Sequence, residues 1–322
     1  MKIVNIVGGG LTGCTLAYLL KKKGYSVTIF EKDKRIGGLC KDNKVAGLIH
    51  NPHGPHIFHT NIEKAAQFMT ERLQMRPYVH RVLSFYENRF YPYPPNEAMM
   101  KAENWTRNDI YERFIRNYTE KMWGRKIEEL GKDITGRIRI NKGNLDTFFL
   151  DKYQGHPVKG YDPLFKSLTE GIKIIYGKTI TAKDKLKGDL LIVTSPLDEY
   201  FENAYGKLEW RGMRTEIVLC HQPSFQPVAS VNYPEKKFPY LRITEFKKLS
   251  GQNHPWTAIA IDYPDKNTKF YPVDRQENMT KVGLYKAAAK KRNVILAGRL
   301  GTYKYINMDQ AILMAMKLAE EL

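Results

Sequence analysis

Three glycines near the start of the chain have the spacing of a phosphate-binding turn. Gly8, Gly10 and Gly13 form a GxGxxG pattern between an apolar run, KIVNIV, and a segment with helical spacing, CTLAYLLKKKG. In such a turn the first glycine permits a sharp bend, the second lets the backbone approach a pyrophosphate, and the third lets helix and strand pack closely. The amides at the helix N-terminus then face the phosphates. The spacing therefore predicts a dinucleotide-binding strand–helix–strand unit.

An acid and a second glycine pair indicate which dinucleotide is bound. The next strand, YSVTIFEK, brings Glu31 to the position where these units accept hydrogen bonds from ribose hydroxyls. Arg35 and the pair Gly37-Gly38 follow it. A second glycine turn after the acid is typical of large flavoproteins, in which it passes under the extended FAD, and it is unusual in NAD enzymes. These residues therefore favour FAD.

Two histidines lie behind a stiff Gly-Pro corner in GPHIFHTN, residues 54–61. His56 and His59 could ligate a metal, act as a general base or pack in a core. A zinc site needs a third ligand at a suitable spacing, and none is evident, so we expect no metal. The stretch alone does not decide between the other two roles.

The bulk composition limits the class of protein. The chain has 322 residues, 42% of them hydrophobic, which predicts a folded protein of two or three sub-domains. Its net charge of +18 would attract phosphorylated ligands, but the basic residues are spread along the chain and form no nucleic-acid-binding motif. Three distant cysteines fit a reducing compartment. No apolar run approaches the roughly 18 residues of a membrane span. We expect a cytoplasmic protein with no nucleic-acid partner and no membrane span.

The remaining elements follow from hydrophobic periodicity and turn residues. RVLSFYENRFYPYPP predicts a hairpin turning at Glu87-Asn88, and the next segment predicts helices that stop at Gly124. Residues 151–177 predict a loop, a helix and a strand. Alternation over residues 210–274 predicts an antiparallel sheet. The last segment predicts a buried strand, a Gly-Arg turn and a final helix that complete the dinucleotide domain.

Eight stretches spread over nearly the whole chain resemble the UDP-galactopyranose mutase family, flavoenzymes that interconvert pyranose and furanose forms of a nucleotide sugar. YTEKMWG and GRLGTYKY are the specific ones, whereas the glycine motif alone is not. The family fold has an FAD-binding domain, a small helical domain and an antiparallel sheet domain, which are the parts that the patterns predict. The stretches are GGGLTG, EKDKRIGG, GPHIFHTN, RNYTEKMWG, DKYQGHPVKGY, PYLRITEF, FYPV and GRLGTYKYINMDQAI.

We therefore predict a mixed α/β fold: a Rossmann-like FAD-binding domain with a small inserted helical domain and an antiparallel β-sheet domain. The expected FAD-binding domain is discontinuous and comprises residues 1–76, 160–208 and 278–322. The expected helical domain comprises residues 96–125, and the expected sheet domain residues 77–95, 126–159 and 209–277.

The resemblance implies an isomerase acting on UDP-galactopyranose or a close relative, such as an N-acetylated or pentose nucleotide sugar. In the family, N5 of reduced flavin attacks the anomeric carbon and UDP leaves. The sugar–flavin adduct opens, recloses through a different hydroxyl, and UDP returns. No net redox occurs, but the flavin must be reduced, and NAD(P)H is a candidate external reductant.

Aromatic residues at the end of the helical segment are expected to hold the uracil. Tyr118 and Trp123 match positions that hold it in the family, and Phe114, one helical turn earlier, would fall on the same face. An aromatic platform suits uracil because stacking needs no net charge. Without the flanking motifs, the same residues would be expected to form a helix-end core.

Two arginines are expected at the UDP pyrophosphate. Arg242 matches one of them, and Arg137 matches the other, with Arg139 as the competing candidate. The planar guanidinium bonds phosphate oxygens bidentately and stabilises the charge that develops on the leaving diphosphate. By resemblance His56 lies beside the flavin, so Arg137, Arg242 and His56 form the expected catalytic group, whereas His59 is expected to be structural.

The other expected contacts also follow from the resemblance. Tyr271 and Tyr305 match tyrosines that reach the diphosphate near the sugar, and Asn232 matches a polar position beside the flavin or the sugar. The expected cofactor-binding residues are Gly8, Gly10, Thr12, Gly13, Glu31, Lys32, Gly38, Leu39, His56, Ile57, Arg299, Asn307 and Met308.

The chain departs from the family at four points. Asn307 stands where the family has an acid, Pro92 stands where an Asn usually contacts the sugar, and Phe148 stands where a Tyr is common. These three leave the identity of the sugar open. The helical segment is shorter than in typical bacterial members, which predicts an oligomeric state unlike the usual family dimer.

Two other functions stay open. An amine-oxidase-like flavoenzyme would share the FAD fold but would have no need of a uracil platform and two diphosphate arginines. A non-catalytic flavoprotein with a degraded mutase site would be consistent with Asn307 and Pro92.

Overall fold

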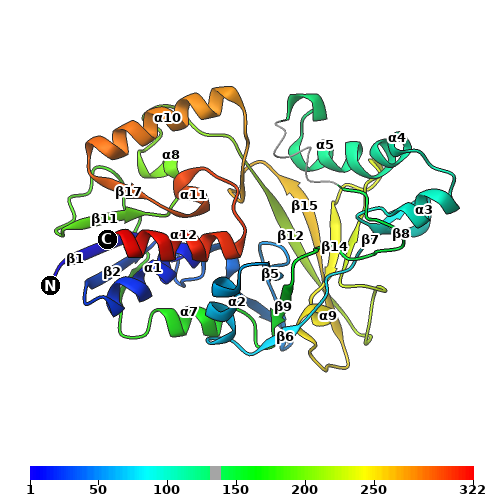
Figure 1. The fold of residues 1–322 in the computed structure, drawn as a ribbon, viewed down its shortest axis with the longest axis horizontal. Coiled ribbons are helices and arrows are strands. Elements are labelled where there is room, and N and C mark those ends of the chain that lie inside the picture. Colours follow the sequence, from blue (N-terminus) through cyan, green and yellow to red (C-terminus); the bar gives the residue numbers. More distant parts are fainter. Residues whose placement is uncertain (131–138) are drawn as a thin grey trace.

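The chain folds into two lobes, each built on its own β-sheet (Figure 1). The structure is a computed structural model and describes residues 1–130 and 139–322. One lobe contains both chain termini and a parallel sheet, and the other contains a larger sheet with short helices beside it. No helix within the described ranges is both long enough and apolar enough to cross a bilayer.

The first lobe is a parallel sheet with helices on both faces. Successive strand residues alternate between two cores: Ile6 and Ile192 belong to one, and Val7 and Val193 to the other. The strands, in sheet order, are β10 (Lys173–Tyr176), β2 (Ser26–Glu31), β1 (Ile3–Val7), β11 (Leu190–Val193) and β17 (Val294–Leu296). The first core packs on α1 (Leu11–Lys22), α2 (Glu63–Thr70), α7 (Asp162–Leu168) and α12 (Met308–Glu321), and the second on α8 (Leu197–Tyr200) and α10 (Gln276–Lys291).

The predicted dinucleotide-binding unit is confirmed. The chain leaves β1 at Val7, turns through the glycines and enters α1 at Leu11, and β2 then pairs with β1 in parallel. A Cβ at Gly13 would overlap the carbonyl oxygen of Gly8, so α1 can approach β1 this closely only with a glycine there.

The second lobe is a seven-stranded sheet, and it carries the predicted hairpin. Glu87 and Asn88 have φ values of 47° and 62°, which suit a two-residue hairpin turn. All strand pairs are antiparallel except β13–β7, which is parallel because a long excursion of the chain, and not a hairpin, joins these strands. In sheet order the strands are β16 (Tyr271–Pro272), β12 (Trp210–Cys220), β15 (Thr257–Asp265), β14 (Arg242–Glu245), β13 (Ser230–Asn232), β7 (Val82–Tyr86) and β8 (Arg89–Tyr93).

Short helices lie beside this sheet, as predicted, and the longest run stops at Gly124, whose φ is 62°. A π-helical turn, η2, interrupts the run between α4 and α5. The helices are α3 (Glu97–Ala102), α4 (Arg107–Ile110), η2 (Tyr111–Arg116), α5 (Asn117–Trp123) and η3 (Ile127–Glu129).

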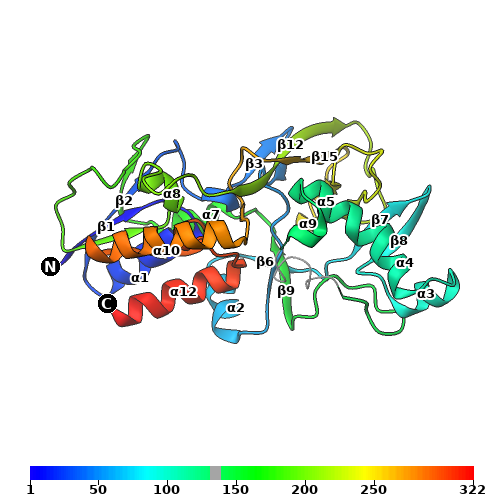
Figure 2. The same cartoon turned by 90° about the horizontal axis from the view of Figure 1, so that it is seen from above.

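A small three-stranded sheet lies where the two lobes meet (Figure 2). Its central strand, β9 (Tyr153–Pro157), falls in a stretch that the sequence predicts as a loop, because its Gly, His and Pro residues carry no strand pattern. It pairs with β5 (Phe58–Thr60) and β6 (Met75–Pro77) and not with the seven-stranded sheet. The described ranges also contain the two-stranded sheet of β3 (Asn43–Val45) and β4 (Leu48–His50), the helices α9 (Phe246–Ser250) and α11 (Gly298–Thr302), and the 3-10 turn η1 (Gly38–Cys40). The division into three domains stays a proposal.

Candidate functional site

A cavity of about 460 Å³ opens at the carboxyl ends of the parallel strands, where α/β folds bind their ligands. Most residues that the sequence assigns to the cofactor line it: Gly8, Gly10, Thr12, Glu31, Lys32, Gly38, Leu39, His56, Arg299, Asn307 and Met308. Two do not. Gly13 lies behind the wall against the backbone of Gly8, and Ile57 packs in a core with Phe246 and Leu249.

The glycines shape this cavity in different ways. A Cβ at Gly8 would lie 2.5 Å from Thr194 Oγ1, so Gly8 is required by the protein's own packing. A Cβ at Gly10 would have no protein atom nearer than the Cα of Gly38, at 4.0 Å. The space beside Gly10 is therefore open to a ligand, as a pyrophosphate would require.

Glu31 is held at the rim of the glycine turn. Its carboxylate accepts hydrogen bonds from the amides of Gly9, at 2.7 Å, and Asp33, at 2.9 Å. The side chain is only 6% exposed, so these two bonds satisfy a buried acid. It lies where a ribose hydroxyl would reach the same cavity.

His56 faces the cavity from the loop that precedes β5. Burial, together with the nearby Arg299, lowers the pKa of His56 to about 3, so the imidazole is neutral. Its carbonyl accepts a hydrogen bond from the Tyr161 hydroxyl at 2.6 Å, which fixes the loop. The Nδ1 atom is buried without a partner within the described structure. An orphaned polar atom in this wall fits a bound flavin, which has ring nitrogens and carbonyls to pair with it.

Sequence reasoning missed several residues of this wall. They lie directly after β10 and β11, where the sequence pattern shows that a strand ends but does not indicate a ligand. They could have been predicted from the general tendency of ligands in α/β folds to bind at the carboxyl ends of the strands. His53 also lines the wall, beside Phe270. The residues after the strands are Lys178, Thr179, Ile180, Thr194, Ser195 and Pro196.

A second cavity, of about 470 Å³, gathers the aromatic residues expected to bind the nucleotide. Tyr118 and Trp123 reach it from α5, and Tyr271 and Tyr305 reach it from the segments after Phe270 and after α11 (Gly298–Thr302). The rings of Tyr271 and Tyr305 stack 5.3 Å apart. Burial raises the pKa of Tyr271 to about 12, so its hydroxyl keeps its proton and can donate a hydrogen bond.

Arg299 connects the two cavities. Its guanidinium carbon lies 5.5 Å from the ring centre of Tyr271 and 4.9 Å from that of Tyr305. Its Nε and Nη2 donate to the carbonyl of Ile306 at 3.0 and 2.6 Å. One arginine of the cofactor wall thus supports the stacked tyrosines of the other cavity.

The structure does not place Phe114 in this cavity. Its ring is 1% exposed and packs against Tyr86, Tyr91 and Trp105. The expectation that it shares a face with Tyr118 assumes α-helical spacing, but Phe114 lies in the π-helical turn η2, where residues four apart no longer align. Phe114 is a core residue of the helical segment.

Arg242 lines neither cavity, but it lies close enough to both to affect the pKa values of residues that line them, His56 in the first and Tyr118 and Tyr271 in the second. Its Nε donates to Asp262 Oδ2 at 2.7 Å, and the Thr215 hydroxyl donates to Oδ1 of the same carboxylate at 2.7 Å. Burial opposes the charge of Arg242, but the fully buried Asp262 raises the pKa above its usual value, so the guanidinium stays charged. Within the described residues its Nη atoms hydrogen-bond only the Met213 sulfur.

The charge of Arg242 changes the pKa values of residues that line both cavities. It lowers the pKa of His56 in the cofactor wall and opposes the rise, caused by burial, in the pKa values of Tyr118 and Tyr271. Gly54, the first residue of GPHIFHTN, allows this approach, since a Cβ there would lie 2.7 Å from Arg242 Nη2. The loop of His56 is thus shaped around the arginine.

Strand register places further polar residues beside Arg242. Asn232 pairs with Arg242, and Ser84 pairs with Asn232, so all three side chains share one face. The Ser84 hydroxyl is buried without a partner in the described structure. Asn232 is 6% exposed and lines neither cavity.

Two departures from the family pattern have structural explanations. Pro92 pairs with Leu83, which puts it on the opposite face from Ser84 and Arg242. Asn307 caps α12: its side chain accepts from an amide of the first turn, and its own amide donates to Gln310 Oε1 at 2.9 Å. Asparagine at that position satisfies a helix end that faces the cofactor cavity.

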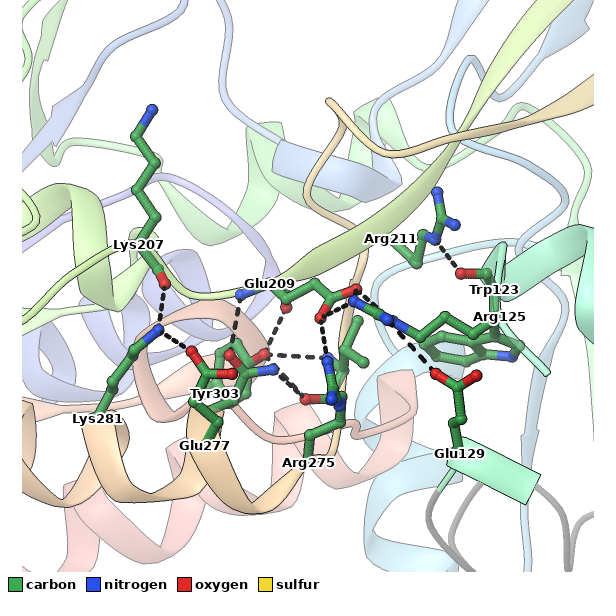
Figure 3. Close-up of polar contacts among 12 residues, drawn as sticks. Trp123, Arg125, Glu129, Lys207, Glu209, Arg211, Arg275, Glu277, Lys281 and Tyr303 are labelled. Carbon is green, nitrogen blue, oxygen red and sulfur yellow. Dashed lines mark hydrogen bonds and ion pairs between the residues drawn. The ribbon is translucent and has the colours of Figure 1, made fainter. Parts of the chain in front are cut away.

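A network of charged residues fixes the end of α5 (Figure 3). Arg125 forms two hydrogen bonds with the Glu209 carboxylate, at 2.9 and 3.0 Å, and Arg275 lies 3.6 Å from the same group. Arg211 Nε donates to the Trp123 carbonyl at 2.5 Å. These contacts attach the residues after Trp123 to the start of β12, and so hold the nucleotide cavity in shape.

The segment before Phe148 includes the expected second arginine. Arg137 lies outside the described residues. Its competitor Arg139 donates to Asn141 Oδ1 and to the carbonyl of Phe148, both at 2.8 Å. Those bonds give Arg139 a structural task and leave Arg137 as our candidate for the second diphosphate arginine.

His59 is engaged in packing. Its ring stacks 3.7 Å from that of Phe149, and its Nδ1 lies 2.9 Å from Asp151 Oδ2. Within residues 1–130 and 139–322, no group of three or more His, Cys, Asp or Glu side chains is arranged to hold a metal ion.

The buried histidines predict acid sensitivity. Burial lowers the pKa of His80 to about 3 and that of His156 to about 4, whereas an unfolded histidine titrates near 6.5. Protons therefore bind the unfolded chain first, and the free energy of unfolding should fall by about 1.4 kcal/mol per pH unit for each such histidine below pH 6.5. His80→Phe, a ring of similar size beside Phe148 and Phe149, should flatten the slope by about one proton in urea unfolding at several pH values. An unchanged slope would show that His80 is protonated in the folded protein.

Comparisons with known proteins agree with this architecture. The family model for UDP-galactopyranose mutase matches residues 113–305, and that for an NAD(P)-binding Rossmann-like domain matches residues 6–72. A probable UDP-galactopyranose mutase of Klebsiella pneumoniae is 28% identical, covering 99% of this chain and 94% of the relative. A dTDP-fucopyranose mutase of Escherichia coli is 26% identical, covering 99% and 98%. The solved structure of a reduced UDP-galactopyranose mutase has a TM-score of 0.80 at 15% identity, covering 100% and 95%, which shows the shared fold.

Proposed function

Because the chain belongs to the UDP-galactopyranose mutase family, we propose that it interconverts the pyranose and furanose forms of a UDP-sugar with bound FAD in its reduced form. The proposed substrate is UDP-galactopyranose or a close relative. The observation that carries this proposal is Arg242, a charged arginine close enough to affect the pKa values both of His56, which lines the dinucleotide cavity, and of Tyr118, which lines the aromatic cavity.

The residues of the first cavity fit FAD. The open space beside Gly10 suits its pyrophosphate, Glu31 suits a ribose hydroxyl, and the unpartnered Nδ1 of His56 suits the flavin ring. Reduced FAD, when bound, would supply the electron pair that displaces UDP from the anomeric carbon. NAD(P)H is our candidate for the reductant.

The residues of the second cavity suit the uridine diphosphate part of the substrate. Tyr118 and Trp123 offer ring faces to the base. Tyr271, which keeps its proton, can donate to a diphosphate oxygen, and Tyr305 lies stacked beside it. The base and the diphosphate of UDP thus each have a chemically matched surface.

Arg242 would act on the reacting bond. Asp262 holds its Nε, which leaves the Nη edge for phosphate oxygens. As the anomeric bond breaks, negative charge grows on the diphosphate, and a fixed guanidinium stabilises it without reorganisation. The neutral His56 adds no competing positive charge.

The two alternatives receive less support. An amine-oxidase-like reaction would not need a second cavity with an aromatic platform and a diphosphate arginine. A degraded mutase site is disfavoured because Pro92 faces away from Arg242 and Asn307 has a capping role.

The identity of the sugar can be tested with a substrate panel. We expect dithionite-reduced, FAD-loaded protein to convert UDP-galactopyranose, or its N-acetylated or pentose counterpart, to the furanose form, as followed by chromatography. Because the Escherichia coli relative is a dTDP-fucopyranose mutase, dTDP-fucopyranose belongs in the same panel. Conversion of the dTDP-sugar alone would overturn the assignment of UDP while leaving the reaction class intact.

A further inference from the structure

The ammonium group of Lys121, in α5, lies within a ring of backbone carbonyl oxygens. Its Nζ lies 2.5 Å from the oxygen of Tyr233, 3.1 Å from those of Glu235 and Phe238, and 3.0 Å from that of Tyr240. An ammonium has three N–H donors, so four acceptors at these distances use its whole donor capacity. Few surface lysines are fixed in this way, because an exposed ammonium exchanges freely with water.

All four carbonyls belong to one loop, residues 233–240, which joins β13 to β14. The loop is closed at its base, where the Tyr233 amide donates to the Leu241 carbonyl at 2.8 Å and Asn232 pairs with Arg242. Arg242 therefore lies directly beyond the base of the loop. A contact that holds this loop in place therefore also helps to hold the backbone of Arg242 in place.

Lys121 lies between the two platform residues of α5 along the chain. Tyr118 precedes it by one turn of α5, and Trp123 follows it at the helix end. Figure 1 shows α5 stacked beside the sheet that contains β14, as a separate element of the same lobe. The Arg211 and Arg125 contacts of Figure 3 hold the end of this helix to β12, and Lys121 holds it to the loop before β14.

We propose that Lys121 is a positioning residue for substrate binding, which sets the distance between the uracil platform on α5 and Arg242. The inference rests on the proposed function. Base and diphosphate are joined by a ribose of fixed length, so the two surfaces bind together only at one separation. Lys121 contacts neither part of the nucleotide in this account, and its effect passes through the carbonyl ring.

The test removes the Lys121 ammonium by substitution and then supplies a small ammonium ion in solution. In FAD-loaded Lys121→Ala, we expect UDP to bind about tenfold or more weakly in calorimetric titration, because one of the two contact surfaces is lost. KM should rise and kcat should change less, since Arg242 keeps its partner Asp262. Methylammonium chloride should restore affinity by filling the ring, whereas tetramethylammonium chloride, which has no N–H donor, should not. The matched control is Lys237→Met, which removes an exposed ammonium of the same loop that pairs with Glu235 inside the loop, and it should bind UDP as the wild type does.

The outcomes separate this inference from the function on which it rests. If the wild-type protein does not bind UDP, the proposed function fails and the inference fails with it. If the wild type binds UDP and Lys121→Ala binds it within twofold, the inference alone fails, even where the melting temperature falls. Restoration by both salts would also overturn it, because that would show an ionic-strength effect.

A measurement on the wild type covers the case in which Lys121→Ala does not fold. The inference requires the 233–240 loop to be coupled to the nucleotide site, so saturating UDP should slow hydrogen–deuterium exchange of that loop. The β3–β4 hairpin, residues 43–50, is the internal reference. Equal exchange of the loop with and without UDP would overturn the inference.

Discussion

Replacing Arg242 with alanine is expected to lower kcat/KM for the preferred UDP-sugar by about ten- to a hundredfold. The charged, bidentate contact that the Arg242 fork can make with a diphosphate contributes about 1.5–3 kcal/mol, and each 1.4 kcal/mol corresponds to a factor of ten. The substitution also leaves the fully buried Asp262 with the Thr215 hydroxyl as its one remaining side-chain partner among residues 1–130 and 139–322. Because charge grows on UDP as the anomeric bond breaks, part of the loss should fall on kcat.

Two variants show whether the effect belongs to the Arg242 fork. Arg242→Lys should recover little, because an ammonium cannot bond two oxygens in parallel. Arg214→Ala, on β12 of the same sheet, removes an exposed arginine paired with Glu216 and should leave kcat/KM near the wild-type value. Kinetics of the reduced variants, with flavin content measured for each, provide the comparison. Wild-type kinetics in Arg242→Ala would place the reaction elsewhere.

Gly10→Val is expected to abolish flavin binding while the protein stays folded. A valine at Gly10 meets no protein atom closer than 4.0 Å at its Cβ, so the fold has room for it, but it would project into the path of the pyrophosphate. Absorbance spectra of the purified variant should show protein without flavin, and circular dichroism should match that of the wild type.

Gly13→Val is the matched contrast, because a Cβ at Gly13 would overlap the Gly8 carbonyl. It should destabilise the protein itself by opening the contact between α1 and β1. A Gly10→Val protein that retains full flavin occupancy would mean that the cofactor does not pass beside Gly10.

Local patterns made much of the fold predictable. The glycine turn, the hairpin at Glu87-Asn88 and the helix stop at Gly124 each depend on a backbone conformation that few residue types favour. β9 carries no such signal, since its residues suit a loop and only its two partner strands make it a strand. Tertiary pairing decided that element, and the sequence could not show it.

Site residues that lie within a sequence motif could be predicted. Residues whose position depends on helix geometry or on strand register could not. Tyr118, Trp123, Tyr271 and Tyr305, each named by a motif, line one cavity, and their contacts with the nucleotide stay a prediction. Phe114 does not join them, because a π-helical turn breaks the spacing on which that expectation depends.

The face of the sheet on which Pro92 lies and the carbonyl ring around Lys121 both depend on contacts between segments that are distant in the sequence. The face of Pro92 depends on its register with Leu83, and the ring around Lys121 depends on how residues 233–240 fold back. No periodicity within a single segment contains that information, since each depends on residues far apart in the chain.

The central claim, an isomerisation that needs reduced FAD but consumes no electrons, can be tested in one anaerobic experiment. FAD-loaded protein is reduced, freed of reductant and mixed with excess UDP-galactopyranose, and the flavin absorbance and the sugar ring form are followed together. We expect many turnovers of furanose product per flavin while the flavin stays reduced, and no product from the oxidised protein. Flavin reoxidation in step with product, or equal turnover by the oxidised protein, would contradict it.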